Sequence, residues 1–141
     1  MAVMESEPLR IMYESAPEIT RIAAGLDAAF ATTAFELLVV DYLQHLTHKA
    51  AETKEREIAY IANECKAMAE RYRCHVMLLA QVNEAGDARW SKEAEDAADV
   101  VIRLKKEHAG AAAGHLTIEK HRNGLVGGCE FAWNGTRQTF V

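Results

Sequence analysis

The 141-residue chain has few cysteines, no long apolar run and no excess of positive charge. Its three cysteines, Cys65, Cys74 and Cys129, are odd in number and widely spaced, which argues against a disulfide framework. No apolar stretch approaches the about 20 residues that span a bilayer. The first ten residues include two glutamates and lack the apolar region of a secretory signal. We therefore expect a soluble, cytoplasmic protein.

The charge balance limits the partners of this chain. The formal net charge is −5, which argues against a broad basic surface that binds nucleic acid. A few cationic loops that act locally remain compatible with this balance. Half of the residues are hydrophobic and 26% are charged, a composition that is typical of a globular domain.

The first half of the chain alternates between strand and helix patterns. Strand patterns cover residues 8–13, 35–40 and 75–80, and the last two are apolar on both faces, as in buried parallel strands. Ser15 and Glu18 have the spacing of a capping box, which predicts a helix to about residue 31. A longer helix is predicted from the apolar stripe Ile58, Ile61, Ala62, Cys65, Met68, Ala69 and Tyr72.

The second half is rich in strand patterns instead. These patterns cover residues 98–104, 115–120, 127–133 and 136–141. The last two flank Asn134-Gly135, which is a strong hairpin signal. The order of elements predicts an α/β fold whose parallel sheet ends in antiparallel strands and a hairpin.

Polar residues follow three of the predicted strands. In open α/β sheets, ligands collect at the carboxyl ends of the strands. Asp41 follows one strand and Gln81 the next, and Asp41 is either the Walker B acid of a nucleotide site or an aspartate that caps a loop. Lys120 and Arg122 alternate along a later strand, so we expect their side chains to lie on one side and to attract an anion. The alternative is a solvated pair of edge charges.

Histidine spacing gives a weaker signal. His45 and His48 are three residues apart, which would suit two metal ligands on one helical turn. No cysteine or third histidine lies nearby in the sequence, so a loop or surface pair is the preferred interpretation.

Four sequence blocks together resemble one family. "LLVVDYLQHL", "AQVN", "DAADVV" and "EKHRNG" are similar, in order and approximate spacing over residues 8–141, to the C-terminal ATPase domain of DnaB-type replicative helicases. The resemblance implies a RecA-like P-loop NTPase core that uses ATP and Mg²⁺. It also implies 5′-to-3′ unwinding of duplex DNA by a ring, expected to be a hexamer, that encircles single-stranded DNA.

The resemblance also implies roles for individual residues. Asp41 would hold Mg²⁺ through water, and Gln81 would be the switch between the γ-phosphate and the DNA-binding loops. Lys120 and Arg122 would reach the nucleotide of the neighbouring subunit, with Arg122 as an arginine finger that contributes ~10³–10⁵ in rate. Positive charge on the DNA-binding loops would come from Lys49, Lys54, Arg56, Arg89 and Lys92.

The chain departs from the family in two places. No part of the sequence matches G-x-x-x-x-G-K-[ST], the loop that wraps nucleotide phosphates. The segment between "AQVN" and "DAADVV" is short and lacks the arginine-rich sequence of the family. We therefore expect residues 1–141 to form a single, partial RecA-like domain that alone does not hydrolyse ATP. Two alternatives remain: a RadA- or KaiC-like ATPase, and a degenerate, non-hydrolysing adaptor or single-stranded-DNA-binding subunit.

Overall fold

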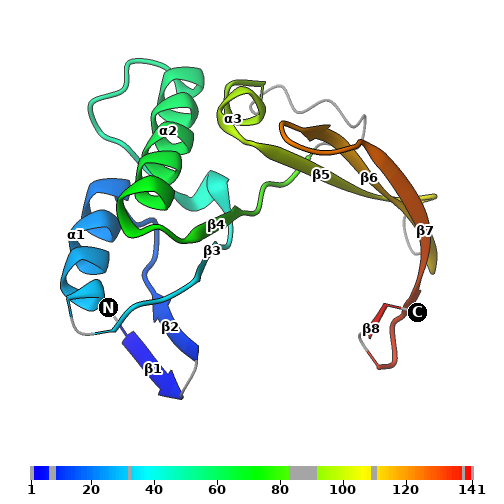
Figure 1. Ribbon diagram of the computed structural model, residues 1–141, viewed down its shortest axis with the longest axis horizontal. Helices are drawn as coiled ribbons and strands as arrows, with labels where there is room; N and C mark the ends of the chain where they lie inside the picture. The colour runs from blue at the N-terminus through cyan, green and yellow to red at the C-terminus, as the bar shows by residue number, and fades with distance from the viewer. Residues whose placement is uncertain are drawn as a thin grey trace. The chain divides into compact units, whose positions relative to one another are not determined.

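The computed structural model describes residues 2–6, 9–31, 33–82, 92–108, 111–137 and 139–140. It divides into two compact units, the N-terminal unit (Met1–Ala97) and the C-terminal unit (Ala98–Val141) (Figure 1). Within the described ranges, no helix has both the length and the apolar character that a bilayer span requires. The expectation of a single domain stays a prediction.

The N-terminal unit contains a hairpin, a parallel strand pair and several helices. Its elements are β1 (Ala2–Ser6), β2 (Leu9–Tyr13), α1 (Ile19–Phe30), β3 (Leu37–Val40), the 3₁₀ helix η1 (Leu43–His45), α2 (Lys54–Tyr72), β4 (His75–Leu78) and α3 (Lys92–Ala97). β1 and β2 pair antiparallel, and β3 and β4 pair parallel. The strand predicted over residues 8–13 is therefore confirmed, but it pairs with β1 and not with β3.

Helix α1 begins without the predicted capping box. Its N-cap is Glu18, and no side chain caps the helix there. The backbone N–H of Ile19 donates instead to the carbonyl oxygen of Thr47, at 3.1 Å. The capping-box prediction is wrong because the chain that follows η1 accepts from this first-turn donor, so no side-chain acceptor is needed.

Helix α2 carries the core of the N-terminal unit. The side chain of Thr53 caps its start, and Arg73 ends it in the left-handed conformation with φ of 51°. The predicted stripe is confirmed: Ala69 is half-buried, and its other six residues are buried, namely Ile58, Ile61, Ala62, Cys65, Met68 and Tyr72. Burial raises the pKa of the Cys65 thiol to about 11, so this cysteine behaves as a small apolar core residue.

Tyr72 joins α2 to α1, which lies beside it (Figure 1). Its hydroxyl donates to Asp27 Oδ1 at 2.7 Å and lies 3.2 Å from the carbonyl oxygen of Ala23. Its ring packs on Phe30 and Phe35, with centroids 5.1 and 5.8 Å away. The tyrosine thus combines an apolar body in the core with a bonded polar end.

The strand pair β3–β4 is covered on one face only. Leu38 and Val76 pack against the core. On the other face Leu37, Val39 and Met77 are 52%, 50% and 49% exposed. The prediction of burial on both faces is not met among the described residues, because the helices of this unit pack on a single side of the pair.

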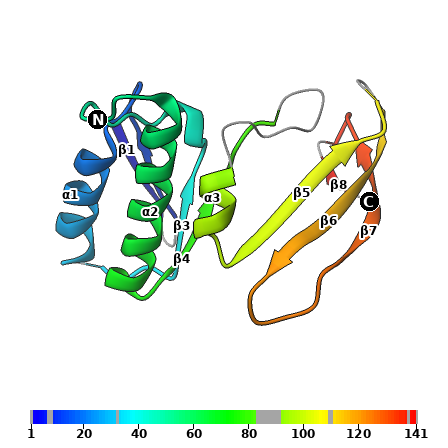
Figure 2. The same ribbon diagram turned by 90° about the horizontal axis from the view of Figure 1, so that it is seen from above.

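The described part of the C-terminal unit is a four-stranded antiparallel sheet (Figure 2). The strands β5 (Val100–Lys106), β6 (Ala113–His121), β7 (Gly127–Asn134) and β8 (Thr139–Phe140) follow in spatial order. Asn134 Oδ1 accepts from the backbone N–H groups of Thr136 and Arg137, at 3.2 and 3.1 Å, which forms the turn between β7 and β8. The α/β class, the run of antiparallel strands and the terminal hairpin are confirmed. The parallel pair belongs to a separate sheet.

Candidate functional site

Asp41 lies at the carboxyl end of β3 on a loop that is anchored on either side. Val40, which precedes it, is 8% exposed, whereas Leu43 and Leu46 after it are 1% and 3% exposed. The carboxylate residue itself is exposed, and the Asp41–Tyr42 peptide bond is cis. Asp41 is therefore a solvent-accessible acid on a fixed loop, so it needs no buried partner.

The chain after β4 is bonded to this same loop. The backbone N–H of Leu79 donates to Val40 O at 3.0 Å, and that of Leu43 donates to Leu79 O at 2.8 Å. The side chain of Gln44 then bonds the backbone of Gln81. Asp41 and Gln81 therefore follow neighbouring parallel strands at one edge of the pair, as the sequence predicts.

Two histidines pack on tyrosines around the loop. His45 Nε2 lies 2.6 Å from the Tyr42 hydroxyl, with ring centroids 4.3 Å apart. His48 stacks on Tyr60, with centroids 3.7 Å apart and ring planes at 11°. In the described part of the chain, no three histidine, cysteine, aspartate or glutamate side chains gather as a metal cluster would require.

The start of α2 combines positive charge with acidic partners. Lys54 forms an ion pair with Glu57, and Arg56 forms one with Glu52. Burial acts to raise the pKa of Glu57, but the hydrogen bonds from Lys54 and from the His48 backbone lower it overall. The charge of both basic residues is therefore partly balanced within this unit.

The five residues predicted to contact DNA do not all lie on loops. Lys49 lies in an exposed turn before α2, and exposed Lys92 is the first residue of α3. Lys54 and Arg56 belong to the first turn of α2, so neither they nor Lys92 lies on a loop as expected. Arg89 lies outside the described residues. Contact of these five residues with DNA stays a prediction.

Arg122 has an acidic partner in the C-terminal unit. Its backbone N–H donates to Asp99 O at 2.9 Å, and its side-chain NH1 lies 2.7 Å from Asp99 Oδ1. Since β6 ends at His121, Arg122 lies in a turn, and the strand alternation that would align it with Lys120 does not reach it. Sequence reasoning missed Asp99 as a partner of Arg122, although this residue lies within the predicted strand pattern "ADVVIRL".

A bulge in the sheet precedes Lys120. Val101 faces Lys120, but the next residue, Ile102, faces Ile118, so Glu119 is left over. Glu119 accepts two bonds from Arg103, at 2.6 and 2.7 Å, and this pairing lowers the pKa of its carboxyl group. The half-buried Lys120 follows this bidentate pair directly.

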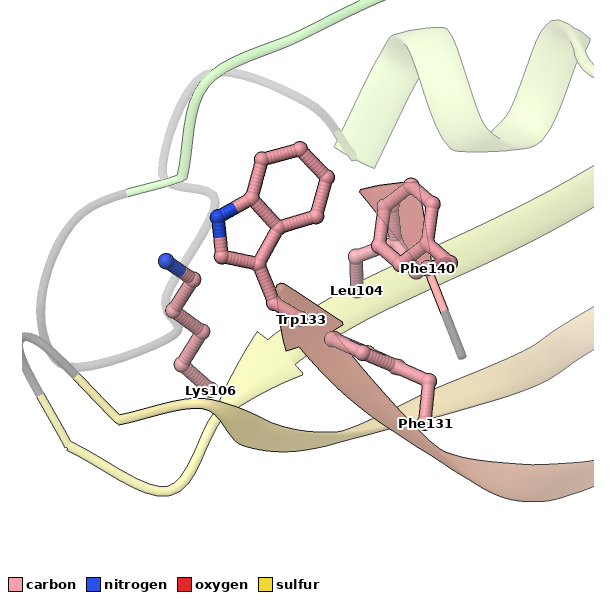
Figure 3. A pocket seen from close by; sticks show the side chains of 5 residues that line it. All are labelled: Leu104, Lys106, Phe131, Trp133 and Phe140. Atoms are coloured by element: carbon pink, nitrogen blue, oxygen red, sulfur yellow. The ribbon is translucent and has the colours of Figure 1, made fainter. Parts of the chain in front are cut away.

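An apolar pocket of about 290 Å³ lies on the sheet of the C-terminal unit (Figure 3). Its lining consists of Leu104, Lys106, Phe131, Trp133 and Phe140. The Phe140 ring meets Phe131 and Trp133 edge to face, with centroids 5.3 and 5.0 Å away. None of the predicted site residues lines this pocket.

A family model matches this chain over its whole length. The whole chain, residues 1–141, matches the family described as DnaB-like helicase C-terminal domain. A search of curated proteins found no match.

Two solved structures have a similar fold. The first is a DnaB-like replicative helicase studied for its interactions with primase, with a TM-score of 0.76 and 23% identity over 92% of this chain and 37% of that one. The second is the ATPase domain of another protein, with a TM-score of 0.76 and 23% identity over 92% of this chain and 53% of that one. The likeness confirms the RecA-like α/β fold, and the chain spans about half or less of either relative.

Proposed function

Because the chain belongs to the family of DnaB-like helicase C-terminal domains, we propose that it is part of a replicative DNA helicase motor. The motor couples ATP hydrolysis to 5′-to-3′ movement along single-stranded DNA and so separates the duplex. The observation that carries the proposal is the placement of Asp41 and Gln81 at one edge of the β3–β4 pair, joined by the loop bonds of Leu43 and Gln44.

Asp41 would hold Mg²⁺ at this edge. Its carboxylate is exposed on an anchored loop, and Mg²⁺ sites commonly use one or two carboxylates while several waters and the phosphate oxygens complete the coordination. The bound ion would neutralise charge on the β- and γ-phosphates of ATP. Asp41 therefore fits a water-mediated role, in which the rigid loop fixes where the ion sits.

Gln81 would act as the switch beside the γ-phosphate. Both of its backbone polar groups are bonded to Gln44, and those bonds do not occupy its side-chain amide. An amide can donate to a phosphate oxygen or accept from a water. The hydrogen bonding of the Gln81 amide can therefore change when the γ-phosphate is lost, and this change can be passed on to the residues that follow Gln81.

Arg122 and Lys120 would act on the nucleotide of a neighbouring subunit. Arg122 is about half exposed, and its ion pair with Asp99 is of the exposed kind that contributes about 0–1 kcal/mol. The guanidinium can therefore leave Asp99 for a phosphate at little cost. A finger that acts in trans requires a neighbouring subunit, and we propose a ring of six such subunits.

Single-stranded DNA would be the track of this motor. Its phosphates would be contacted by Lys49 from the turn before α2, by Lys54 and Arg56 from the start of α2, and by Lys92 from the start of α3. We propose the same contact for Arg89, which lies outside the described residues. Since Lys54 and Arg56 already have acidic partners, we expect Lys49 and Lys92 to contribute more of the salt dependence of binding.

A phosphate-binding loop is not among these 141 residues. We therefore propose that the chain alone binds ATP–Mg²⁺ weakly or not at all and does not turn it over. Titration calorimetry of the chain with ATP and Mg²⁺ tests this, and micromolar binding accompanied by turnover would contradict it.

Reconstitution tests the proposed function itself. The chain is mixed with a family member that has a phosphate-binding loop but carries alanine in place of its own arginine finger. We expect DNA-dependent ATP hydrolysis to return, and Arg122→Ala to lower it by ~10³-fold or more.

The matched control for this experiment is Arg137→Ala. Arg137 is an exposed arginine of the same unit, and its backbone N–H donates to Asn134 Oδ1. Equal rescue by all three chains would contradict the role of Arg122. Binding of single-stranded DNA without any rescue would instead favour a non-hydrolysing subunit.

A further inference from the structure

Gln44 bridges the two loops that carry Asp41 and Gln81. It lies in η1, three residues after Asp41, and it is separated from Gln81 by 37 positions in the sequence. Its side-chain Nε2 donates to Gln81 O at 2.8 Å, and its Oε1 accepts from Gln81 N at 3.2 Å. One side chain thus satisfies both backbone polar groups of one distant residue.

This clamp extends the β3–β4 pairing beyond its backbone bonds. The backbone bonds between the two segments end with the Leu79 N–H to Val40 O and the Leu43 N–H to Leu79 O contacts. The amide of Gln44 then takes the place of a further residue of the ladder, since it offers one donor and one acceptor side by side. Gln81 is therefore held although it lies three residues past the end of β4.

We infer that Gln44 is a positioning residue that fixes Gln81 relative to Asp41, so that the acid and the switch face the same nucleotide. The inference rests on the proposed function, because it gives Gln44 a role through the switch assigned to Gln81. Both bonds of the clamp go to the backbone of Gln81. They therefore fix the position of its Cα, and with it the point from which the switch side chain extends, without using the side-chain amide.

Only a terminal carboxamide supplies both halves of the clamp. Gln44→Met keeps a similar side-chain length and removes both bonds. Gln44→Glu keeps an acceptor for the Gln81 N–H but places a negatively charged oxygen against the Gln81 carbonyl. The two variants therefore separate loss of the clamp from loss of its donor half.

Backbone amide exchange in the chain tests the clamp directly. In Gln44→Met we expect the Gln81 amide to exchange roughly five- to tenfold faster, the change expected for loss of one ordinary hydrogen bond. The Leu79 amide should keep its exchange rate, because its bond goes to the backbone of Val40. In Gln44→Glu the Gln81 amide should stay closer to the wild-type rate.

A matched control is Asn63→Ala. The Asn63 side chain also bonds a backbone carbonyl in the same unit, that of Ala59 at 2.9 Å, but both of these residues belong to α2. This substitution should leave exchange at Gln81 unchanged. An unchanged Gln81 amide in Gln44→Met would overturn the clamp.

The reconstituted ATPase tests the positioning role. In the chain joined to the phosphate-loop segment of a family member, so that Gln81 faces a complete nucleotide site, Gln44→Met should lower kcat about 10- to 100-fold, as a small displacement of an active-site group does. The KM for ATP should stay within about twofold, because the clamp positions Gln81 and leaves the remaining contacts with the nucleotide in place. Asn63→Ala should match the wild type.

The outcomes separate this inference from the proposed function. A wild-type chain that restores no hydrolysis overturns the proposed function, and the positioning role falls with it. Full wild-type kcat in Gln44→Met overturns the positioning role alone. Equal losses in Gln44→Met and Asn63→Ala would indicate a merely structural effect and would also overturn it.

Discussion

The two units of this chain contain similar apolar strand patterns, but among the described residues only the strands of the N-terminal unit have a face covered by helices. In the N-terminal unit, α1 and α2 cover one face of β3–β4 and enclose a core that includes Ile19, Ile61 and Met68, each at most 1% exposed. In the described part of the C-terminal unit, the strand residues Ile102 and Leu104 are more than half exposed. A strand pattern therefore predicts a strand, but its burial depends on which element packs against it.

This difference in packing matches the different roles proposed for the two units. The N-terminal unit holds Asp41 and Gln81 on loops that the core anchors through Leu43 and Val40. The C-terminal unit presents Arg122 from a turn beside an open sheet. In the proposed motor, neighbouring subunits share each nucleotide site. An anchored acid from one subunit and an accessible arginine from the next are the two parts that such a site requires.

The largest expected effect comes from matched truncations in the two units. Ile61→Ala removes a fully buried side chain and should lower the free energy of unfolding by about 2–5 kcal/mol. Ile102→Ala acts on a side chain that is 55% exposed and should cost less than about 1 kcal/mol. Urea unfolding followed by circular dichroism measures both. Equal losses of unfolding free energy in the two variants would contradict the difference in packing between the units.

Tyr72→Phe should give a smaller effect within the better-packed unit. The variant keeps the ring contacts with Phe30 and Phe35 but removes the bond to Asp27. We expect a loss of about 1 kcal/mol in unfolding free energy, as for one ordinary hydrogen bond. The same urea titration measures it, with Tyr13→Phe on the exposed β2 as a control that should show no change.

The sequence predicts those parts of the fold and site that follow from local periodicity. The stripe from Ile58 to Tyr72 repeats at helical spacing, so both the helix and its buried face can be read directly. The shared position of Asp41 and Gln81 follows because parallel strands end at the same edge.

The remainder depends on pairings between residues that are distant in sequence. The clamp from Gln44 to Gln81, the partner Asp99 of Arg122 and the pairing of β1 with β2 leave no periodic signal. The exposure of Val39 and Ile102 also cannot be read from their apolar character. It is decided by the elements that lie against each sheet face.

The smallest expected effect is the acid response of the C-terminal unit. The pairing with Arg103 holds the pKa of Glu119 below its ordinary value of 4.5. A carboxyl group whose pKa is lower in the folded state stabilises the fold above its unfolded pKa, and this contribution is lost as the pH falls through the folded pKa. Because Glu119 is partly exposed, the contribution at neutral pH should be below about 1 kcal/mol.

The measurement is the unfolding free energy of wild type and Glu119→Gln between pH 7 and acid. The difference between the two proteins should be present at neutral pH and should vanish once the Glu119 carboxyl is protonated. A difference that persists unchanged in acid would show that packing, and not charge pairing with Arg103, holds this pair.

Mixing two inactive variants tests the central claim most directly. Asp41→Asn and Arg122→Ala are each introduced into the chain joined to the phosphate-loop segment of a family member, so that every subunit carries a phosphate loop, and the two proteins are assembled first separately and then at equal amounts. If Asp41 and a neighbour's Arg122 complete one site, random mixing in a ring should leave about a quarter of the interfaces with both residues intact. We predict ATP hydrolysis well above that of either variant alone and up to about a quarter of the wild-type rate. A mixture no more active than its two components would contradict a nucleotide site shared between subunits.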